Sequence, residues 1–230
     1  TRGANNNDLL KYVSKILFWG NNELLNFKNR HFSYLTESKI EVTGNPRFDL
    51  CKKKYESFYN LIHKDLTIQK NIIMVDTAFG TYNNIIDINL QFEHWKNVKY
   101  EKNRGEVNRL KWLEKIKPLY EYQKKIFPIF LDGIMNLCIK LPDHNFLIRP
   151  HPVENIETYK DYFKNKKNVI ISNGGTAVEK FKYAKLLIHN GCSTAVEAFF
   201  AKTPIICFLP SYNEEMVQTL PKDISLQAFN

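Results

Sequence analysis

The feature that most constrains this chain is a regular alternation, in its second half, of short apolar runs with polar stretches of helical spacing. The apolar runs have the length of buried strands and cover residues 145–150, 168–172, 185–189 and 204–209. The intervals expected to be helical are 153–164, 176–183 and 193–202. Strands that alternate with helices at this spacing predict an α/β fold with a parallel, doubly wound sheet.

The first half of the chain predicts fewer elements. Apolar runs indicate strands at 15–20, 39–43 and 71–77. Helices are expected over 48–63 and 119–140, and residues 80–117 are interpreted as an insertion. A change of domain is expected between residues 44 and 70, because a partial αβ unit there gives way to a complete new set.

The composition excludes several classes of protein. Hydrophobic residues make up 43% of the 230 positions, too many for an intrinsically disordered chain. No apolar run approaches the roughly 18 residues that a membrane span needs. The four cysteines have neither metal-ligand spacing nor the density of a disulfide framework, which favours a reducing cytoplasm. No metal and no cofactor is therefore expected.

The positive charge does not indicate a nucleic-acid partner. The formal net charge is +9, but 27 of the 33 basic residues are lysines that are scattered or in short runs. A nucleic-acid binder more often gathers arginines on one face with interleaved aromatic residues. The lysines are interpreted as solvated, with an acidic small molecule or peripheral association at an anionic membrane surface as alternative partners.

The first candidate site is Arg149-Pro150-His151-Pro152, at the carboxyl end of the expected strand 145–150. Open α/β sheets bind ligands at the carboxyl ends of their strands. The prolines stiffen the loop, Arg149 offers a fixed cation, and His151 offers a donor that can switch its charge. This pattern predicts an anion-binding loop, and the alternative is a rigid turn with an exposed histidine.

The second candidate site follows the expected strand 185–189, where a turn leads into a helix. The predicted phosphate-binding residues are Asn190, Gly191, Cys192, Ser193 and Thr194. Exposed backbone N–H groups and the positive end of the helix dipole favour a phosphate there. Glu197 lies one helical turn beyond Ser193, where its carboxylate can accept hydrogen bonds from a ribose. The alternatives are an ordinary helix cap and a solvated carboxylate.

Further residues are expected to line the same cleft, and they are Gly44, Asn45, Arg47, Thr77 and Asn83. Cys192 is interpreted as a small packing residue, because no His-Asp or His-Asn pair accompanies it convincingly. The three tryptophans are expected in the core rather than as stacking platforms, and they are Trp19, Trp95 and Trp112.

Four segments carry a family resemblance, namely VTGNPRFDL (42–50), IIMVDTAFGTYN (72–83), FLIRPHPVEN (146–155) and LLIHNGCSTAVEAFFAKTPII (186–206). Together they resemble the bacterial surface carbohydrate biosynthesis protein family. That family looks like two-domain, GT-B-type glycosyltransferases with Rossmann-like sheets, similar in pattern to CDP-glycerol glycerophosphotransferases and more distantly to UDP-N-acetylglucosamine 2-epimerases. The resemblance covers about residues 15–225.

The resemblance implies a division into two domains within a longer protein. Residues 1–48 are expected to be the remnant of an incomplete amino-terminal, acceptor-side domain. Residues 49–230 are expected to be the carboxyl-terminal domain that binds the nucleotide-sugar, with the insertion at about 80–117.

The resemblance also implies a function. The chain would belong to a glycosyltransferase that uses a CMP-, CDP- or UDP-linked sugar to extend a polysaccharide or a lipid-linked acceptor, in the cytoplasm or at the inner face of the membrane. Arg149 and His151 would be the catalytic groups that hold the donor phosphate, 190–194 would cradle it, and Glu197 would hold the ribose. The catalytic base stays open between Asp49, Asp76 and groups of the amino-terminal domain. The alternatives are a UDP-sugar 2-epimerase of the same fold and a non-catalytic nucleotide- or polyanion-binding module.

Overall fold

The computed structural model describes residues 12–31, 39–55, 71–88, 90–91 and 109–229, which belong to two compact units, 1–52 and 53–230. In the first unit, strand β1 (Ile16–Phe18) pairs in parallel with β2 (Ile40–Val42), and helix α2 (Asn21–His31) connects to β1. The buried ring of Phe18 meets Phe27 of α2 edge to face, with 5.2 Å between the ring centroids. This aromatic pair holds the helix against the strand.

The helix predicted over 48–63 is wrong over 50–55. Helix α3 (Pro46–Asp49) starts earlier and lasts one turn, and a short 3-10 helix, η3 (Lys53–Tyr55), follows a turn. Helix α3 buries none of its residues, so no apolar face stabilises a longer helix. The remainder of the predicted helix, 56–63, lies outside the described residues.

The expectation that the tryptophans lie in the core is wrong for Trp19. The side chain of Trp19 is 63% exposed and meets Phe48 edge to face at 6.1 Å between centroids. Trp95 and the side chain of Trp112 lie outside what the structure describes.

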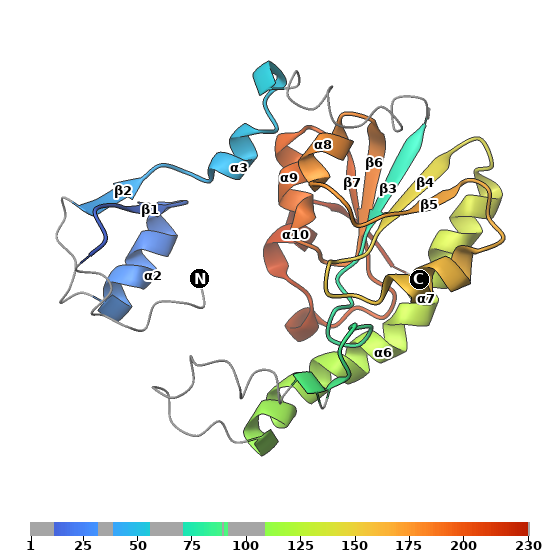
Figure 1. The fold of residues 1–230 in the computed structure, drawn as a ribbon, viewed down its shortest axis with the longest axis horizontal. Coiled ribbons are helices and arrows are strands. Elements are labelled where there is room, and N and C mark those ends of the chain that lie inside the picture. The colour runs from blue at the N-terminus through green and yellow to red at the C-terminus, as the bar shows by residue number, and fades with distance from the viewer. Residues whose placement is uncertain (1–11, 32–38, 56–70, 89, 92–108, 230) are drawn as a thin grey trace. The chain divides into compact units, whose positions relative to one another are not determined.

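The second unit contains a parallel sheet of six strands (Figure 1). They are β3 (Ile72–Asp76), β4 (Asn145–Arg149), β5 (Val169–Ile171), β6 (Ala184–His189), β7 (Ile205–Phe208) and β8 (Leu226–Ala228). Their order is β5-β4-β3-β6-β7-β8, so the chain moves outward from β3 to β5, crosses to the other side of β3, and moves outward again to β8. This is the doubly wound, Rossmann-like order, and it confirms the predicted α/β fold class.

Helices cover both faces of this sheet (Figure 1). One face carries α6 (Arg109–Lys140) and α7 (Ile156–Phe163), and the other carries α8 (Ala177–Phe181) and α9 (Thr194–Phe200). Alternate residues of β3 serve the two layers, because Ile73 and Val75 belong to the core under α6, whereas Met74 packs with Phe181 and Ala198. A strand buried on both faces therefore reads as one continuous apolar run.

Helix α6 is longer than predicted. It begins at Arg109 rather than at 119 and continues through Pro118 and Pro128. A proline inside a helix removes one backbone hydrogen bond, but the face of α6 that includes Phe130 and Ile134 is fully buried and stabilises the helix. Part of the predicted insertion, 80–117, is thus helical, and its residues 92–108 lie outside the described ranges.

The hydroxyl residues that precede helices α8 and α9 do not cap them through their side chains. Thr176 precedes α8, but its hydroxyl donates to Glu179 Oε1 at 2.8 Å and caps no backbone N–H group. Ser193 precedes α9 with helical backbone angles, φ −62° and ψ −16°, and its side chain makes no cap bond. A capping side chain needs an extended backbone to reach back over the helix start, which explains the missing bond at Ser193.

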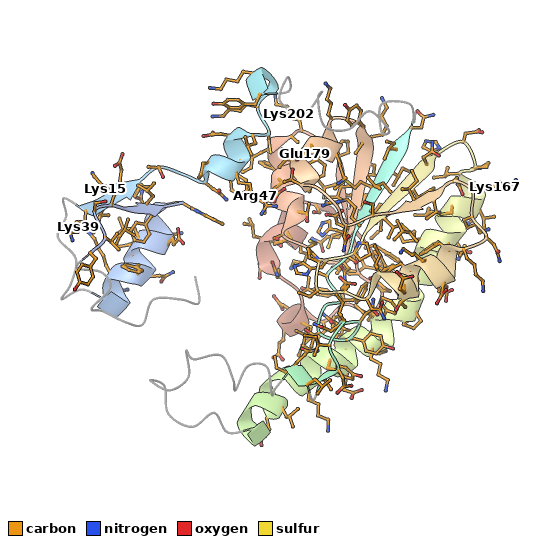
Figure 2. All side chains as sticks on the ribbon, viewed as in Figure 1. Lys15, Lys39, Arg47, Lys167, Glu179 and Lys202 are labelled. Atoms are coloured by element: carbon orange, nitrogen blue, oxygen red, sulfur yellow. The ribbon has the colours of Figure 1, made fainter. Side chains whose placement is uncertain are left out.

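The remaining elements complete the unit around β8. Helix α10 (Thr219–Asp223) follows the short 3-10 helix η5 (Glu214–Met216) and leads into β8. No helix within the described ranges is both long and apolar enough to cross a membrane. The lysines Lys167 and Lys202 are exposed, as expected for solvated charges (Figure 2), whereas Lys180 is buried.

Candidate functional site

The carboxyl ends of β3, β4 and β6 meet at one edge of the sheet. Asp76, the last residue of β3, is in register with Arg149 of β4 on one side and with His189 of β6 on the other. The strand order reverses between β3 and β6, and ligands of open α/β sheets bind outside such a reversal. The structure therefore brings the predicted residues Arg149, His151 and 190–194 to the same edge, with β3 between the strands that carry them.

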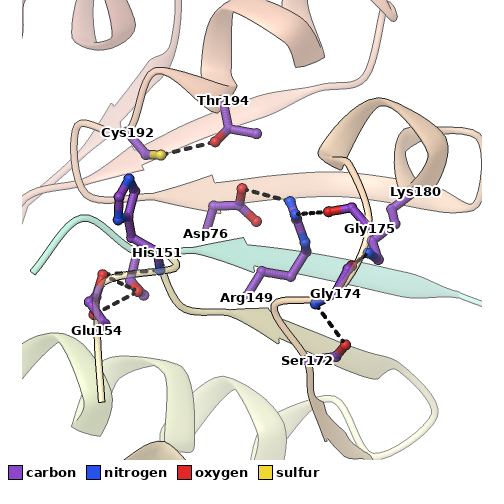
Figure 3. Close-up of polar contacts among 11 residues, drawn as sticks. Asp76, Arg149, His151, Glu154, Ser172, Gly174, Gly175, Lys180, Cys192 and Thr194 are labelled. Carbon is purple, nitrogen blue, oxygen red and sulfur yellow. Dashed lines mark hydrogen bonds and ion pairs between the residues drawn. The ribbon is translucent and has the colours of Figure 1, made fainter. Parts of the chain in front are cut away.

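An ion pair lies at the centre of this edge (Figure 3). Arg149 Nη1 lies 3.1 Å from Asp76 Oδ2, and the two side chains are only 11% and 5% exposed. Burial raises the pKa of Asp76, while the Arg149 charge, the Thr194 hydroxyl and the Lys180 charge oppose that rise. Asp76, one of the open candidates for the catalytic base, is thus a buried partner of Arg149.

His151 is the exposed member of the loop that follows β4. Its Nδ1 accepts a hydrogen bond from the Val153 N–H at 3.3 Å, which leaves Nε2 as the nitrogen that carries the proton. Burial of part of the ring lowers the pKa of His151, so the imidazole is neutral at pH 7. In Figure 3 the ring points toward the side of the site on which Cys192 lies. His151 can therefore donate one neutral N–H group to a ligand.

The backbone of this loop is held by the buried carboxylate of Glu154. Glu154 Oε1 accepts hydrogen bonds from Thr77 Oγ1 at 3.0 Å, from the Phe79 N–H at 3.0 Å and from the His151 N–H at 3.2 Å. Its Oε2 accepts a further bond from the Tyr159 hydroxyl of α7. Burial raises the pKa of Glu154, and these four donors oppose the rise. One carboxylate thus joins the loops after β3 and β4 to helix α7.

The loop that follows β6 is held by a buried neutral imidazole. His189 Nδ1 accepts hydrogen bonds from the Gly191 N–H at 3.0 Å and the Cys192 N–H at 3.1 Å. Its Nε2 lies 2.9 Å from Ser225 Oγ, and that hydroxyl donates to the Pro221 carbonyl at 2.6 Å, so Nε2 is the donor to Ser225. Burial lowers the pKa of His189 to about 4, which keeps this arrangement neutral.

These bonds occupy two of the backbone donors of the predicted phosphate-binding turn, 190–194. The N–H groups of Gly191 and Cys192, which were expected to face a phosphate, are directed to His189. Gly191 has φ +94°, a backbone conformation that glycine adopts without strain. Asn190 Oδ1 accepts a bond from the Ala78 N–H at 2.8 Å and so ties this loop to the one after β3. The turn therefore offers side chains rather than these two amides.

The thiol of Cys192 is a packing group, as predicted. Burial raises the pKa of Cys192 to about 11, so it is not a thiolate at neutral pH. Its Sγ lies 2.9 Å from Thr194 Oγ1. Ser193, beside it, is exposed, and its hydroxyl does not cap the helix. Ser193 is thus the residue of this loop whose side chain is most available to a ligand.

Glu197 is not the solvated helix residue of the alternative interpretation, because only 5% of it is exposed. It lies in the first turn of α9. Its predicted contact with a ribose stays a prediction.

The other predicted cleft-lining residues are divided between the two units. Gly44, Asn45 and Arg47 belong to the first unit, where Asn45 Oδ1 caps α3 by accepting the Arg47 N–H at 3.0 Å. Thr77 lies at the edge, but its hydroxyl is bonded to Glu154 and it is buried. Asn83 Oδ1 accepts from the Thr158 hydroxyl at 3.0 Å, so its side chain joins two loops. Asp49, the other open candidate for the base, pairs with Lys52 at 2.6 Å.

Sequence reasoning missed three residues that shape this edge, namely Glu154, Lys180 and His189. A signal existed for His189, since it is a lone polar residue at the end of an apolar strand and immediately precedes a glycine turn. Glu154 follows His151 by three residues and resembled an ordinary helix start. Lys180 looked like one of many helical lysines. Among the described side chains, no group of three or more His, Cys, Asp or Glu residues could hold a metal ion.

No protein-family model and no curated protein matches this chain. Among solved structures, a variant of the wall teichoic acid polymerase TagF soaked with CDPG is 17% identical over 90% of this chain and 43% of its own, with a TM-score of 0.49. The Methanocaldococcus jannaschii UDP-GlcNAc 2-epimerase in complex with UDP-GlcNAc and UDP is 16% identical over 84% of this chain and 45% of its own, with a TM-score of 0.43.

A third solved structure is KpsC from Thermosulfurimonas dismutans, a beta Kdo 2,7 transferase. It is 13% identical over 87% of this chain and 67% of its own, with a TM-score of 0.30. This chain spans less than half the length of the polymerase and of the epimerase. All three TM-scores lie below 0.5, so the fold assignment rests on the strand order described above.

Proposed function

We propose that this chain is the donor-binding part of a GT-B-type transferase that uses a nucleotide-activated sugar, CMP-, CDP- or UDP-linked, to build a surface polysaccharide or glycolipid. In this proposal residues 49–230 bind the donor. Residues 1–48 are a remnant of the acceptor-side domain, and the acceptor is a polysaccharide or a lipid-linked molecule.

The observation that carries the proposal is the convergence of anion-binding side chains at the point where the strand order reverses. Arg149 ends β4 and His151 follows it, whereas Ser193 and Thr194 follow β6, on the other side of β3. A fixed cation, a neutral N–H donor and two hydroxyls suit the phosphate oxygens of a nucleotide. The ribose would then lie beside Glu197 in the first turn of α9.

The proposed chemistry is stabilisation of the leaving phosphate. Negative charge builds on the phosphate as the bond to the sugar breaks, and donors already aimed at that position stabilise the transition state. His151 would donate from Nε2, since its Nδ1 is held by the Val153 amide. Arg149 would add a positive charge whose position is fixed by Asp76. Both groups act without a change in their own covalent structure.

The carboxylates at this edge disfavour the epimerase alternative. An epimerase acting on the sugar of a UDP-sugar needs carboxylates that converge on a sugar carbon. Asp76 is paired with Arg149, and Glu154 accepts four hydrogen bonds from the protein itself. Both carboxylates are thus engaged by groups of the protein, which fits phosphate binding better than proton abstraction.

The proposal is tested by isothermal titration of the chain with CMP, CDP and UDP. His151→Ala should weaken binding of these nucleotides by roughly 10- to 100-fold, as expected when a hydrogen bond to a charged phosphate is lost. His144 provides a matched control, because it precedes β4 at the opposite end of the same strand. His144→Ala should change nucleotide affinity by less than about twofold.

Two results would contradict the proposal. One is the absence of binding of any of the three nucleotides to the wild-type chain at millimolar concentration. The other is salt-sensitive binding of inorganic polyphosphate that does not depend on His151, which would support a polyanion-binding module instead.

A further inference from the structure

The lysine of α8 is buried, and its hydrogen bond goes to a neutral carbonyl rather than to the nearby carboxylates of Glu179 and Asp76. Lys180 is only 3% exposed, and its Nζ donates to the carbonyl oxygen of Gly174. No carboxylate within the described ranges forms an ion pair with Lys180. Buried charges in proteins are normally paired with an opposite charge, because a neutral carbonyl compensates poorly for the lost hydration. Lys180 therefore has capacity for an anion.

Arg149 is incompletely paired in the same place. Its Nη1 contacts Asp76, and its Nη2 donates to the carbonyl oxygen of Gly175 at 3.4 Å. Its buried Nε has no hydrogen-bond partner among the described residues. Figure 3 shows the turn at Gly174 and Gly175 lying between the side chains of Arg149 and Lys180. Two cations thus direct donors at two neighbouring neutral carbonyls.

The turn that supplies these carbonyls has two glycines at its tip, so no side chain projects from it there. Gly174 and Gly175 are both exposed, and the Gly174 N–H is bonded to Ser172 Oγ at 3.3 Å. Gly175 has φ +69°, where any other residue would be strained. No side chain of these two residues separates the cations from solvent. An anion that binds the two cations here would replace these two carbonyl oxygens as their hydrogen-bond acceptors.

We propose that Lys180 and Arg149 form a second anion subsite, which binds an anionic oxygen group of the donor and releases the Gly174 and Gly175 carbonyls that occupy the two cations in its absence. The proposal rests on the proposed function and deepens it, since it assigns the donor a second negative group besides the phosphate near His151. That group is either the second phosphate of a nucleoside diphosphate or a carboxylate on the transferred sugar.

Binding of an anion at this subsite should change the protonation of Lys180. Burial and the nearby Arg149 charge lower the pKa of Lys180 to about 8, and Glu179 and Asp76 oppose this effect. The groups that face Lys180 are thus Arg149 from β4, Asp76 from β3, Glu179 from its own helix and the Gly174 carbonyl. An anion bound beside Lys180 would raise its pKa, so binding near pH 8 should take up about half a proton.

The test is calorimetric titration of the chain with inorganic pyrophosphate at pH 8, in buffers of different ionisation enthalpy. Pyrophosphate itself titrates near this pH, so the proton taken up by Lys180 is measured as the difference between wild-type and Lys180→Met chains, which should be about half a proton. Lys180→Met should also weaken binding by at least about tenfold. Lys180→Arg should restore affinity without this additional uptake, because a guanidinium does not titrate at this pH. The exposed Lys182 is the matched control, and Lys182→Met should keep both affinity and uptake within about twofold.

The donor group is identified with nucleotides of increasing charge. If the subsite takes the second phosphate, Lys180→Met weakens UDP more than UMP. If it takes a sugar carboxylate, the variant weakens UDP-glucuronate and leaves UDP-glucose unchanged.

The inference is overturned if wild-type and Lys180→Met chains bind pyrophosphate equally, or if the two chains exchange the same number of protons on binding. Its failure is distinct from failure of the proposed function. Nucleotide binding that depends on His151 but not on Lys180 removes the second subsite alone. Pyrophosphate binding that depends on Lys180, without nucleotide binding, removes the proposed function alone.

Discussion

The loops that follow β4 and β6 lie on either side of β3, and a different kind of buried acceptor holds each loop in place. The β4 loop is arranged around Glu154, a carboxylate that collects donors from three segments of the chain. The β6 loop is arranged around His189, a neutral imidazole that collects two amides from its own turn. In both loops a buried group uses backbone N–H donors, so the contacts left for a ligand come mainly from side chains.

The largest expected effect follows from removing the carboxylate of the β4 loop. Glu154→Ala leaves the donors of Thr77, Phe79, His151 and Tyr159 without their acceptor, and we expect the free energy of unfolding to fall by roughly 3–5 kcal/mol. Urea unfolding followed by circular dichroism measures this change.

Glu157 of α7 is the control for that variant, because it is exposed and pairs with Lys160 of the same helix at 2.7 Å. Glu157→Ala should cost less than about 0.5 kcal/mol. Equal losses from the two variants would mean that Glu154 does not organise the loops.

A smaller effect is expected in the β6 loop, because His189 serves fewer donors. His189→Ala should lower the free energy of unfolding by about 2–3 kcal/mol, since two amides lose their acceptor and a cavity forms. His189→Asn keeps an acceptor near the position of Nδ1 and should recover part of the loss. If the asparagine and alanine variants unfold at the same urea concentration, the two amide bonds contribute nothing measurable.

Acidification should change the contributions of the two loops to the free energy of unfolding in opposite directions. Burial raises the pKa of Glu154 above 4.5. The stability that this raised pKa gives the folded chain is therefore fully present below pH 4.5, and it is lost as the pH rises through the pKa of the folded state. Burial lowers the pKa of His189 from 6.5 to about 4, so its contribution is full above pH 6.5 and is lost as pH falls toward 4.

The loss of stability between pH 7 and pH 4 should therefore be smaller than in the wild-type chain for a variant of His189 and larger for a variant of Glu154. Between pH 7 and pH 4, His189→Asn should lose less stability than the wild-type chain, because it has no imidazole to protonate. Glu154→Gln should lose more, because it lacks the proton uptake that favours the folded wild-type chain in acid. Urea unfolding at several pH values measures both slopes, and deviations of the same sign would contradict the contrast between the loops.

The smallest effect concerns the ribose. Glu197→Gln keeps the shape of the side chain and removes its charge, so a hydrogen-bonded ribose should lose about 1 kcal/mol of binding. Titration calorimetry should show this loss for CMP and for CDP, but not for inorganic phosphate, which has no ribose. Equal weakening of all three ligands would indicate a disturbed helix α9 instead.

The central strands of the second unit were predictable because they are buried on both faces, whereas the edge strand β8, whose Leu226 is 72% exposed, was not predicted. Strands buried on both faces form continuous apolar runs, and Ile72 to Asp76 is the clearest case. The order of the strands could not be read from the runs, since nothing local to β3 or β6 encodes their pairing. The helix expected over 48–63 is wrong over 50–55, because local spacing does not reveal that α3 buries none of its residues.

The candidate site was predictable only where its residues follow strands directly. Arg149, His151 and the 190–194 turn were found in this way. Glu154 and Lys180 were not, because their roles depend on contacts between distant segments, such as the bond from the Phe79 amide to Glu154 across 75 positions. For the same reason the availability of the Gly191 and Cys192 amides was overestimated, since it depends on the burial of His189.

The central claim is that a nucleotide binds at the carboxyl edge shared by β3, β4 and β6, and an amide NMR titration with CDP tests it most directly. We predict that the amide signals that shift belong to residues 77–80, 151, 174–175 and 190–194, and that they saturate at one CDP concentration. The signals of Asn71, Asn145 and Ala184, at the opposite ends of the same strands, should stay unchanged. Shifts confined to that opposite edge, or to residues 12–31, would contradict the claim.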